Sequence, residues 1–271
     1  MSKLIASIVV YRSDLKALEQ TFACLQRAGE GALAQGKIQA LKVVVVDNAS
    51  GSEYRRGLQA LTCSFQQSLA IELLFRPDNG GYGLGHNAVE TQVGDFRLVL
   101  NPDAFLEPDS LTHALGFLKA HPEVGVVVPK VLDAQGHFCA CKSYPSVLAL
   151  GLRGFAPHWL KVKFSRYLAA YEQRGRDFSQ VVFDPGLISG CCFLVRGEVW
   201  QAVGGFDPGY FLYFEDFDFS LRARQVTRIA YLPYFRVVHL GGGAADKGLW
   251  HSLLFVRSAV RFFNRHGWRW I

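Results

Sequence analysis

The sequence predicts an α/β protein whose mostly parallel central sheet is flanked by helices. Three observations support this fold class. Short runs rich in β-branched residues alternate with segments of helical length. The run from Leu41 to Val46 is almost continuously apolar, as expected for a strand that helices cover on both faces. Half of the 271 residues are hydrophobic and 19% are charged, which argues against long disordered stretches.

The expected elements follow in chain order. Strands are predicted at Leu4–Val10, Leu41–Val46, Ile71–Phe75, Phe96–Leu100, Val124–Val128 and Arg228–Val238, with a helix at Glu107–Leu118. The first run is interpreted as a strand rather than a signal peptide, because no small-residue cleavage site follows it. The pattern weakens from 130 to 185, which suggests an acceptor-facing insertion, and an organised block resumes from Leu187 to Arg224. We expect one domain over 1–243, with halves of about 1–110 and about 111–243, and a C-terminal helix over 244–271.

Composition excludes several classes of function. The net charge is +6, but five basic residues and one acid lie in the last 31 residues, and no nucleic-acid reading motif occurs, so nucleic acid is not expected as a partner. No apolar run is long enough to span a bilayer, so we expect a cytoplasmic protein. The six cysteines lack the spacing of a zinc site, which fits a reducing compartment.

Polar residues at strand ends are the first candidates for binding, because ligands of open α/β sheets lie beyond the carboxyl ends of the strands. Asp47 follows the second strand, where its carboxylate could accept a hydrogen bond from the N3–H of uracil or thymine. An Asx turn, in which Asp47 or Asn48 accepts from local backbone amides, is the alternative.

A glycine-rich run extends from Asn79 to Asn87. Its four glycines would permit close approach of the backbone to a ligand. The run does not match a dinucleotide fingerprint, since His86 occupies the position of the third glycine, and it has no Walker lysine. A flexible loop is the alternative interpretation.

The turn Asn101-Pro102-Asp103 ends the fourth expected strand. Asp103 is a suitable oxygen ligand for a divalent cation that bridges a diphosphate, although a structural turn before the following helix would use the same residues. His239 ends the last expected strand and could supply an imidazole ligand, or serve as an ordinary structural histidine.

Three acids lie among aromatic residues between Phe211 and Phe219. If a helix begins near Glu215, Phe217 and Leu221 share a core face and Asp216 lies on another side. Burial beside aromatic rings would raise the pKa of Asp216, which suits a general base. Acids are also favoured at a helix N-terminus for structural reasons.

Taken in order, these segments resemble the motifs of family 2 glycosyltransferases, especially the rhamnosyltransferase-like branch with a GT-A fold. The motifs are Ser7–Tyr11, Val46–Ser50, Asn79–Asn87, Leu100–Asp103, Gly204–Asp207 and Glu215–Asp218. Together they cover roughly residues 4 to 243. The commoner metal motif of the family is Asp-x-Asp, and the neutral Asn101 stands at its first position here, which weakens the case for tight metal binding.

The resemblance implies an inverting transfer of a sugar from a nucleotide-diphosphate donor, with dTDP-rhamnose the best single guess and a UDP-sugar the other. The implied acceptor is a saccharide or lipid-linked saccharide in cell-surface polysaccharide synthesis, and the implied cofactor is Mn²⁺ or Mg²⁺. The implied catalytic residues are Asp216 and Glu215, and the implied metal ligands are Asp103 and His239. The implied donor contacts are Tyr11, Asp47, Asn79, Gly80, Gly81, Gly83, Asn87, Asn101 and Asp103. A sugar nucleotidyltransferase or hydrolase, or a non-catalytic nucleotide-sugar binding protein, are the alternatives.

The C-terminal segment predicts a basic amphipathic helix. Arg257, Arg261, Arg265 and Arg269 recur every four residues, beside an apolar stripe of Leu253, Val256, Val260 and Phe263. Such a helix, with Trp268 and Trp270, could rest on the inner face of the cell membrane, or pack against the protein itself.

Overall fold

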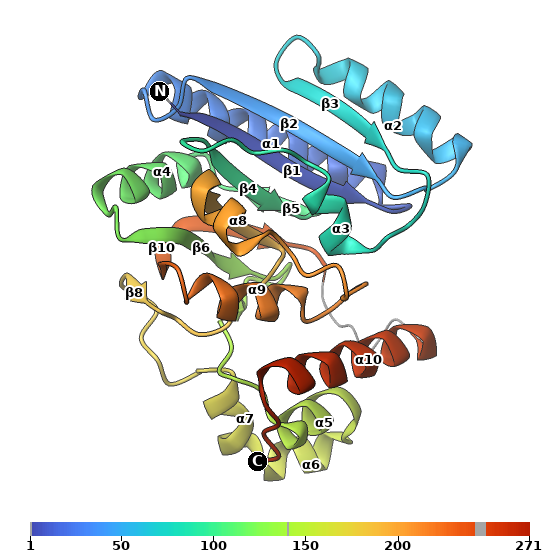
Figure 1. Cartoon of the computed structure of the whole chain (residues 1–271), viewed down its shortest axis with the longest axis vertical. Coiled ribbons are helices and arrows are strands. Elements are labelled where there is room, and N and C mark those ends of the chain that lie inside the picture. The colour runs from blue at the N-terminus through green and yellow to red at the C-terminus, as the bar shows by residue number, and fades with distance from the viewer. Residues whose placement is uncertain (1, 140, 242–247) are drawn as a thin grey trace.

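A single twisted sheet runs through the molecule, and the computed structural model describes it over residues 2–139, 141–241 and 248–271 (Figure 1). In that part of the chain the strand order is β3-β2-β1-β4-β9-β6-β10-β5, with β7 paired to β6 and β8 to β10. The strands are β1 (Lys3–Val10), β2 (Ala40–Asp47), β3 (Ala70–Phe75), β4 (Phe96–Leu100), β5 (Ala104–Leu106), β6 (Val124–Leu132), β7 (Phe138–Cys139), β8 (Val182–Phe183), β9 (Cys192–Arg196) and β10 (Arg228–His239). The pairs β1–β2, β2–β3, β1–β4 and β6–β10 are parallel, so the predicted α/β fold with a mostly parallel sheet is confirmed.

Helices cover both faces of the sheet. They are α1 (Leu15–Ala34), α2 (Ser52–Phe65), α3 (Tyr82–Asn87), α4 (Ser110–Ala120), α5 (Val147–Phe155), α6 (His158–Lys163), α7 (Ser165–Tyr171), α8 (Gly197–Val203), α9 (Glu215–Ala223) and α10 (Leu249–His266). One core cluster joins the sheet to α1, α2 and α4, and a second joins it to α8 and α9. Helices α5, α6 and α10 gather at the end of the molecule far from β3 (Figure 1).

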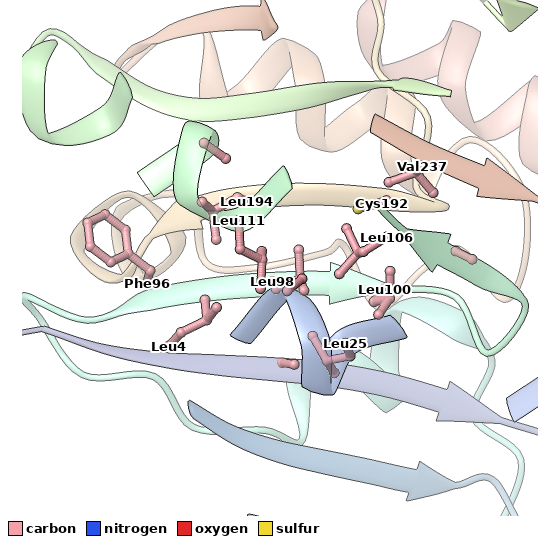
Figure 2. Close-up of a cluster of buried hydrophobic side chains, with 14 of the residues drawn as sticks. Leu4, Leu25, Phe96, Leu98, Leu100, Leu106, Leu111, Cys192, Leu194 and Val237 are labelled. Atoms are coloured by element: carbon pink, nitrogen blue, oxygen red, sulfur yellow. The ribbon is translucent and has the colours of Figure 1, made fainter. Parts of the chain in front are cut away.

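The core explains why the apolar runs of the sequence form strands. Leu4, Leu98 and Leu100 are fully buried beneath Leu25 of α1 and Leu111 of α4 (Figure 2). Burial of a leucine side chain stabilises the folded state by about 1.5 to 3 kcal/mol relative to an exposed one. Because β1, β2 and β4 carry apolar residues on both faces, they can lie only in the middle of the sheet.

The register of the strands places the polar residues that follow them at one edge of the sheet. Val10 of β1 is paired with Asp47 of β2, and Ile8 of β1 with Leu100 of β4. The carboxyl ends of these parallel strands therefore meet at the same edge, as the sequence predicts. The antiparallel pair β5–β10 adds a further connection at this edge, since Ala104 lies opposite His239.

The segment after Asp103 differs from the predicted helix start. Ala104–Leu106 forms strand β5 against β10, and α4 begins only at Ser110. The hydroxyl of Ser110 accepts from the amide of Arg236 at 3.0 Å and donates to its carbonyl at 2.8 Å, which ties the helix start to β10. The contact with β10 continues to Glu107, whose amide donates to the carbonyl of Arg236 at 3.1 Å, and local sequence contains no sign of that distant partner.

The C-terminal helix contacts the body through a face other than most of the predicted stripe. The buried residues of α10 include Leu254, Ala259, Phe262 and Phe263, whereas Leu253, Val256 and Val260 of the predicted stripe are exposed. The predicted stripe is therefore exposed except at Phe263, and its contact with a membrane stays a prediction. The helix packs against the body through the neighbouring face, because its phenylalanines fill the space between α5 and the start of α9. The first part of the segment predicted as helical, 244–247, lies outside the described residues.

Candidate active site

The turn Asn101-Pro102-Asp103 leads from β4 directly into β5, and the pairing of β5 with β10 brings His239 beside it. Asn101 Nδ2 lies 3.1 Å from His239 Nε2, and Asp103 Oδ1 lies 3.3 Å from the same nitrogen. The amide of Leu240 donates to the carbonyl of Asp103 at 3.1 Å, which fixes the start of the following loop. Three side chains predicted from separate parts of the sequence thus converge.

These groups suit a divalent cation. A carboxylate oxygen and an imidazole nitrogen are common ligands of Mn²⁺, and the buried Oδ1 of Asn101 has no hydrogen-bond partner within residues 2–139, 141–241 and 248–271. In the same part of the chain, no group of three His, Cys, Asp or Glu side chains could hold a metal by itself. A cation held by Asp103 and His239 would therefore take its remaining ligands from a bound molecule, such as a diphosphate.

Glu215 and Asp216 form the first turn of α9, after two residues in the left-handed region. The φ angles of Tyr213 and Phe214 are 69° and 66°. Each such residue costs on the order of 1 kcal/mol or more, so the surrounding packing must hold this bend. Asp216 Oδ2 accepts from the amide of Gly190 at 2.8 Å, and its Oδ1 accepts from the following amide at 2.8 Å. The bend therefore fixes both oxygens of one carboxylate.

The two neighbouring acids differ in their protonation. Burial raises the pKa of Glu215 to about 8, and the negative charge of Asp216 acts in the same direction. Burial also raises the pKa of Asp216, to about 6, while hydrogen bonds from Gly190 and Phe217 oppose this rise. Two backbone amides donate to Asp216, whereas Oε2 of Glu215 has no hydrogen-bond partner among the described residues, so we assign the charge of the pair to Asp216 and the proton to Glu215. A partly desolvated carboxylate of this kind is suited to accept a proton.

Two cavities meet at Asp216. The first cavity, of about 630 Å³, is lined by Asn101, Asp103, His239 and Tyr82 together with Asp216. The second cavity, of about 440 Å³, lies between α5, α6, α10 and the start of α9. Tyr213, Glu215 and Asp216 line both. The Asp216 carboxylate therefore belongs to the lining of both cavities.

Asp47 does not line either cavity. Its buried carboxylate accepts from the amide of Ser50 at 3.1 Å and from Arg55 Nε at 2.6 Å. Arg55 also lies 5.0 Å from the centre of the Phe75 ring and donates to the carbonyl of Arg76 at 2.8 Å. The turn contacts that the sequence offered as an alternative are thus present. Tyr11, at the neighbouring strand end, is 47% exposed and also outside both cavities.

The glycines of the run from Asn79 to Asn87 are required by contacts within the protein. Gly81 has a φ of 91°, and a Cβ there would overlap the carbonyl group of Phe211. A Cβ at Gly83 would lie 2.8 Å from Phe206 Cβ. Asn79 Oδ1 accepts from the amide of Gly81 at 3.1 Å, which closes the turn. These contacts seat α3 closely against the loop before α9.

The same run positions two further groups. Asn87 donates to the carbonyl of Phe206 at 2.7 Å and accepts from its amide at 2.9 Å, so its side chain clamps the loop before α9. Tyr82 donates to the carbonyl of Gly190 at 2.6 Å, at the wall of the first cavity. A Cβ at Gly80 would lie 3.0 Å from Arg76 Nη2. None of Asn79, Gly80, Gly81, Gly83 and Asn87 lines the first cavity.

Comparison with known proteins assigns these features to a family. The sequence model described as "Glycosyltransferase like family 2" matches residues 20–253. The chain belongs to glycosyltransferase family 2. This glycosyltransferase is 27% identical over 254 residues to the N-acetylglucosaminyl-diphospho-decaprenol L-rhamnosyltransferase of Mycobacterium tuberculosis, in an alignment that covers 88% of this chain and 76% of that protein.

One further relative and one solved structure are also similar to this chain. Over 173 residues, the glycosyltransferase is 27% identical to Rhamnosyltransferase WbbL of Escherichia coli (strain K12), an alignment that covers 59% of this chain and 61% of WbbL. The crystal structure of GalNAc-T7 with UDP, GalNAc and Mn²⁺ has a TM-score of 0.62 and 15% identity, and the match covers 89% of this chain and 43% of that one. The structural similarity shows that the fold is GT-A.

Several groups in this glycosyltransferase were not foreseen from the sequence. Arg97 is fully buried under the glycine-rich helix α3, where it donates to the carbonyl of His86 at 3.0 Å and lies 4.2 Å from the Trp200 ring centre. Burial lowers the pKa of Arg97 to about 9 and the pKa of His86 well below its usual value. Ser7 shares a 2.7 Å hydrogen bond with His86 Nδ1. An arginine inside an apolar strand run, Phe96–Leu100, was the signal that could have revealed this network.

Proposed function

We propose that this glycosyltransferase moves L-rhamnose from dTDP-rhamnose to a hydroxyl group of a lipid-linked saccharide, with inversion at the anomeric carbon. The position of Asp216 where two cavities meet is the observation that supports this proposal. One cavity carries the groups suited to a diphosphate and its metal, and the other is open for an acceptor. The names of two relatives, both rhamnosyltransferases, support the choice of sugar.

In the proposed reaction, Asp216 accepts the proton of the acceptor hydroxyl. The hydroxyl oxygen forms a bond to the anomeric carbon as the bond from that carbon to the diphosphate oxygen breaks, and the electron pair leaves with the diphosphate. Hydrogen bonds from Gly190 and Phe217 hold the Asp216 carboxylate toward the cavity. With Glu215 protonated beside it, the two acids carry one negative charge in total, and this charge lies on the base.

On the donor side, Asp103 and His239 would hold Mn²⁺ or Mg²⁺, which stabilises the negative charge of the leaving diphosphate. Asp47 is proposed to accept the N3–H of the nucleobase, and its contact with Arg55 would fix the orientation of the carboxylate. The other proposed donor contacts, from Tyr11 and the run from Asn79 to Asn87, lie outside the first cavity and would act from the loops around it.

Replacing Asp216 with Asn tests the proposed base. The amide keeps the shape of the side chain but cannot accept the proton, so we expect kcat to fall by about 10² to 10⁴-fold. Donor binding, followed as the rise in Tm on adding dTDP-rhamnose with Mn²⁺, is expected to remain. Asp177→Asn, at an exposed site, is the matched control. Transfer by Asp216→Asn at nearly the wild-type rate would refute the mechanism.

The same assay separates the alternative enzyme classes. A sugar nucleotidyltransferase or hydrolase does not need an acceptor hydroxyl, so it would release rhamnose or a sugar phosphate without a lipid-linked acceptor present. A rhamnosyltransferase is expected to form a new glycoside only when the acceptor is present. Mass analysis of the products distinguishes these outcomes.

We also propose that the enzyme works as a peripheral protein at the inner face of the cell membrane. No helix within the described ranges is both long and apolar enough to cross a bilayer. However, Leu249, Trp250 and Leu253 of α10 are 86%, 67% and 64% exposed, while Arg261 on another face of the helix binds Asp207. An exposed apolar face on a helix that is anchored to the protein suits insertion into a membrane surface.

Liposome flotation tests this membrane contact. The double variant Trp250→Ser, Leu253→Ser removes two large apolar side chains, and we expect its partition onto phosphatidylglycerol liposomes to fall by about tenfold or more. Val226→Ser removes an apolar side chain that is 52% exposed in the turn after α9 and is the matched control. Equal flotation of the double variant and the control would refute the contact.

A further inference from the structure

The lining of the second cavity contains both aromatic and charged side chains. Tyr171, Phe217 and Phe255 are among the aromatic ones, and Glu215 and Asp216 are its acids. Arg153 of α5 and Lys161 of α6 are also part of its lining. The cavity therefore offers a proton acceptor, stacking surfaces and two cationic side chains to one bound molecule.

Ion pairs within the protein neutralise these two cations only in part. Arg153 forms an ion pair with Glu172 at 3.3 Å, but Glu172 also pairs with Arg174 at 2.5 Å, so one carboxylate serves two guanidinium groups. Lys161 has no ion-pair partner among the residues that the structure describes. A positive excess therefore remains at this wall, and it favours a ligand that carries at least one negative charge.

Exposed apolar side chains lie on three of the helices that line this cavity. Phe155 at the end of α5 is 59% exposed, and Trp159 of α6 is 67% exposed. Leu253 of α10, the helix that supplies Phe255 to the cavity, is 64% exposed. An isoprenoid chain, which has no polar groups, would bury all three side chains and remove their apolar surface from water.

We infer that Arg153 and Lys161 bind the diphosphate that links the acceptor saccharide to its lipid, while the exposed apolar side chains around them contact the first isoprene units. This inference rests on the proposed function, because it specifies which part of a lipid-linked acceptor enters the second cavity. The acceptor sugar then reaches toward Asp216, and the lipid leaves along α6 and α10. The two cations select for acceptors with a charged linkage.

Binding of farnesyl diphosphate tests the inference without requiring any transfer. Isothermal titration calorimetry is done with saturating dTDP and Mn²⁺, so that the donor cavity is filled. We expect Lys161→Gln and Arg153→Gln each to weaken binding by about tenfold or more, because each removes a charge-assisted hydrogen bond. Lys163→Gln, on the same helix but outside the cavity lining, is the matched control and is expected to bind like the wild type.

Two further ligands identify the group that is bound. Farnesol has the lipid without the charge, and its weaker binding is expected to be the same in all variants. Inorganic pyrophosphate has the charge without the lipid, and it is expected to bind more weakly than farnesyl diphosphate but with the same dependence on Lys161. Because Lys161 makes no ion pair in the described chain, Lys161→Gln keeps the test valid if Arg153→Gln disturbs folding near Glu172.

Unchanged farnesyl diphosphate binding in Lys161→Gln, or an equal loss for farnesol, would overturn the inference. Failure of this inference can be told apart from failure of the proposed function. If farnesyl diphosphate binds with the expected dependence but no rhamnose is transferred, the subsite stands and the proposed reaction is refuted. If rhamnose is transferred and the KM for a diphosphate-linked acceptor is the same in Lys161→Gln as in the wild type, the subsite is refuted alone.

Discussion

Asp218 is expected to be the strongest electrostatic anchor of α10, and its replacement by Asn tests this. The side chain is fully buried, and its oxygens lie 2.7 Å from Arg222 Nε, 2.8 Å from His266 Nε2 and 3.3 Å from Arg265 Nε. The change keeps the shape but leaves Arg222 and His266 without their anion, whereas Arg265 keeps its ion pair with Asp207. Breaking a buried ion pair by removing one partner costs about 3 to 5 kcal/mol.

The exposure of the partners refines this value. The side chains of Arg222 and His266 are 14% and 13% exposed, so water screens them little, whereas Arg265 is 43% exposed and contributes under about 1 kcal/mol. Asn can still accept a hydrogen bond, which lowers the penalty. We therefore expect the free energy of unfolding to fall by about 3 kcal/mol, the low end of the range for buried pairs.

Urea unfolding followed by tryptophan fluorescence measures this loss, and the Tm is expected to fall by roughly 6 to 12 °C. Glu72→Gln is the control, because the Lys42–Glu72 pair is half-exposed on both sides and its loss should have little effect. A loss in Asp218→Asn no larger than in the control would show that apolar packing alone anchors α10.

Three further predictions concern the site. Gly81→Ala is expected to lower the Tm by several degrees more than Gly36→Ala, because both positions have a positive φ but only the first would place a Cβ against Phe211; equal shifts would show that the close contact is unimportant. The rate of transfer at saturating substrate is expected to fall as the pH drops through about 6, since protonation of Asp216 removes the base, and a pH–kcat profile flat between 5 and 8 would contradict this. Asp103→Asn is expected to abolish the Mn²⁺-dependent rise in Tm with dTDP, and an undiminished rise would exclude Asp103 as a ligand.

Much of the fold could be predicted because local patterns and long-range packing agree. The run Leu41–Val46 forms β2 almost as expected, since an apolar run of this length is stable only between two layers of helices. The predicted helix start at Glu107 was wrong, because the amide of Glu107 donates to the carbonyl of Arg236 in β10 and α4 begins only at Ser110. The segment from 130 to 185, which lacks a clear period, contains the short helices α5, α6 and α7, which were not predicted, although Ser146 caps the start of α5 and Pro157 precedes α6.

The site, like the fold, could be predicted from the sequence only in part. Asn101, Asp103, Glu215, Asp216 and His239 line one cavity, as expected from their positions at element ends. The glycine-rich run behaved differently, since its glycines accommodate other parts of the protein rather than open space for a ligand. Close contacts of this kind depend on partners that are distant in sequence and cannot be read from a local motif.

The sequence by itself determined the α/β architecture, the edge of the sheet that carries the acids, and the family, because these depend on periodicity and on the order of short motifs. Only the tertiary structure decided which carboxyl carries the charge. Glu215 and Asp216 are neighbours in sequence, but the amide of Gly190, brought from 26 residues away, hydrogen-bonds to Asp216. The second cavity is also a product of the tertiary structure, because Arg153, Lys161 and Phe255 come together only when α5, α6 and α10 pack around the start of α9.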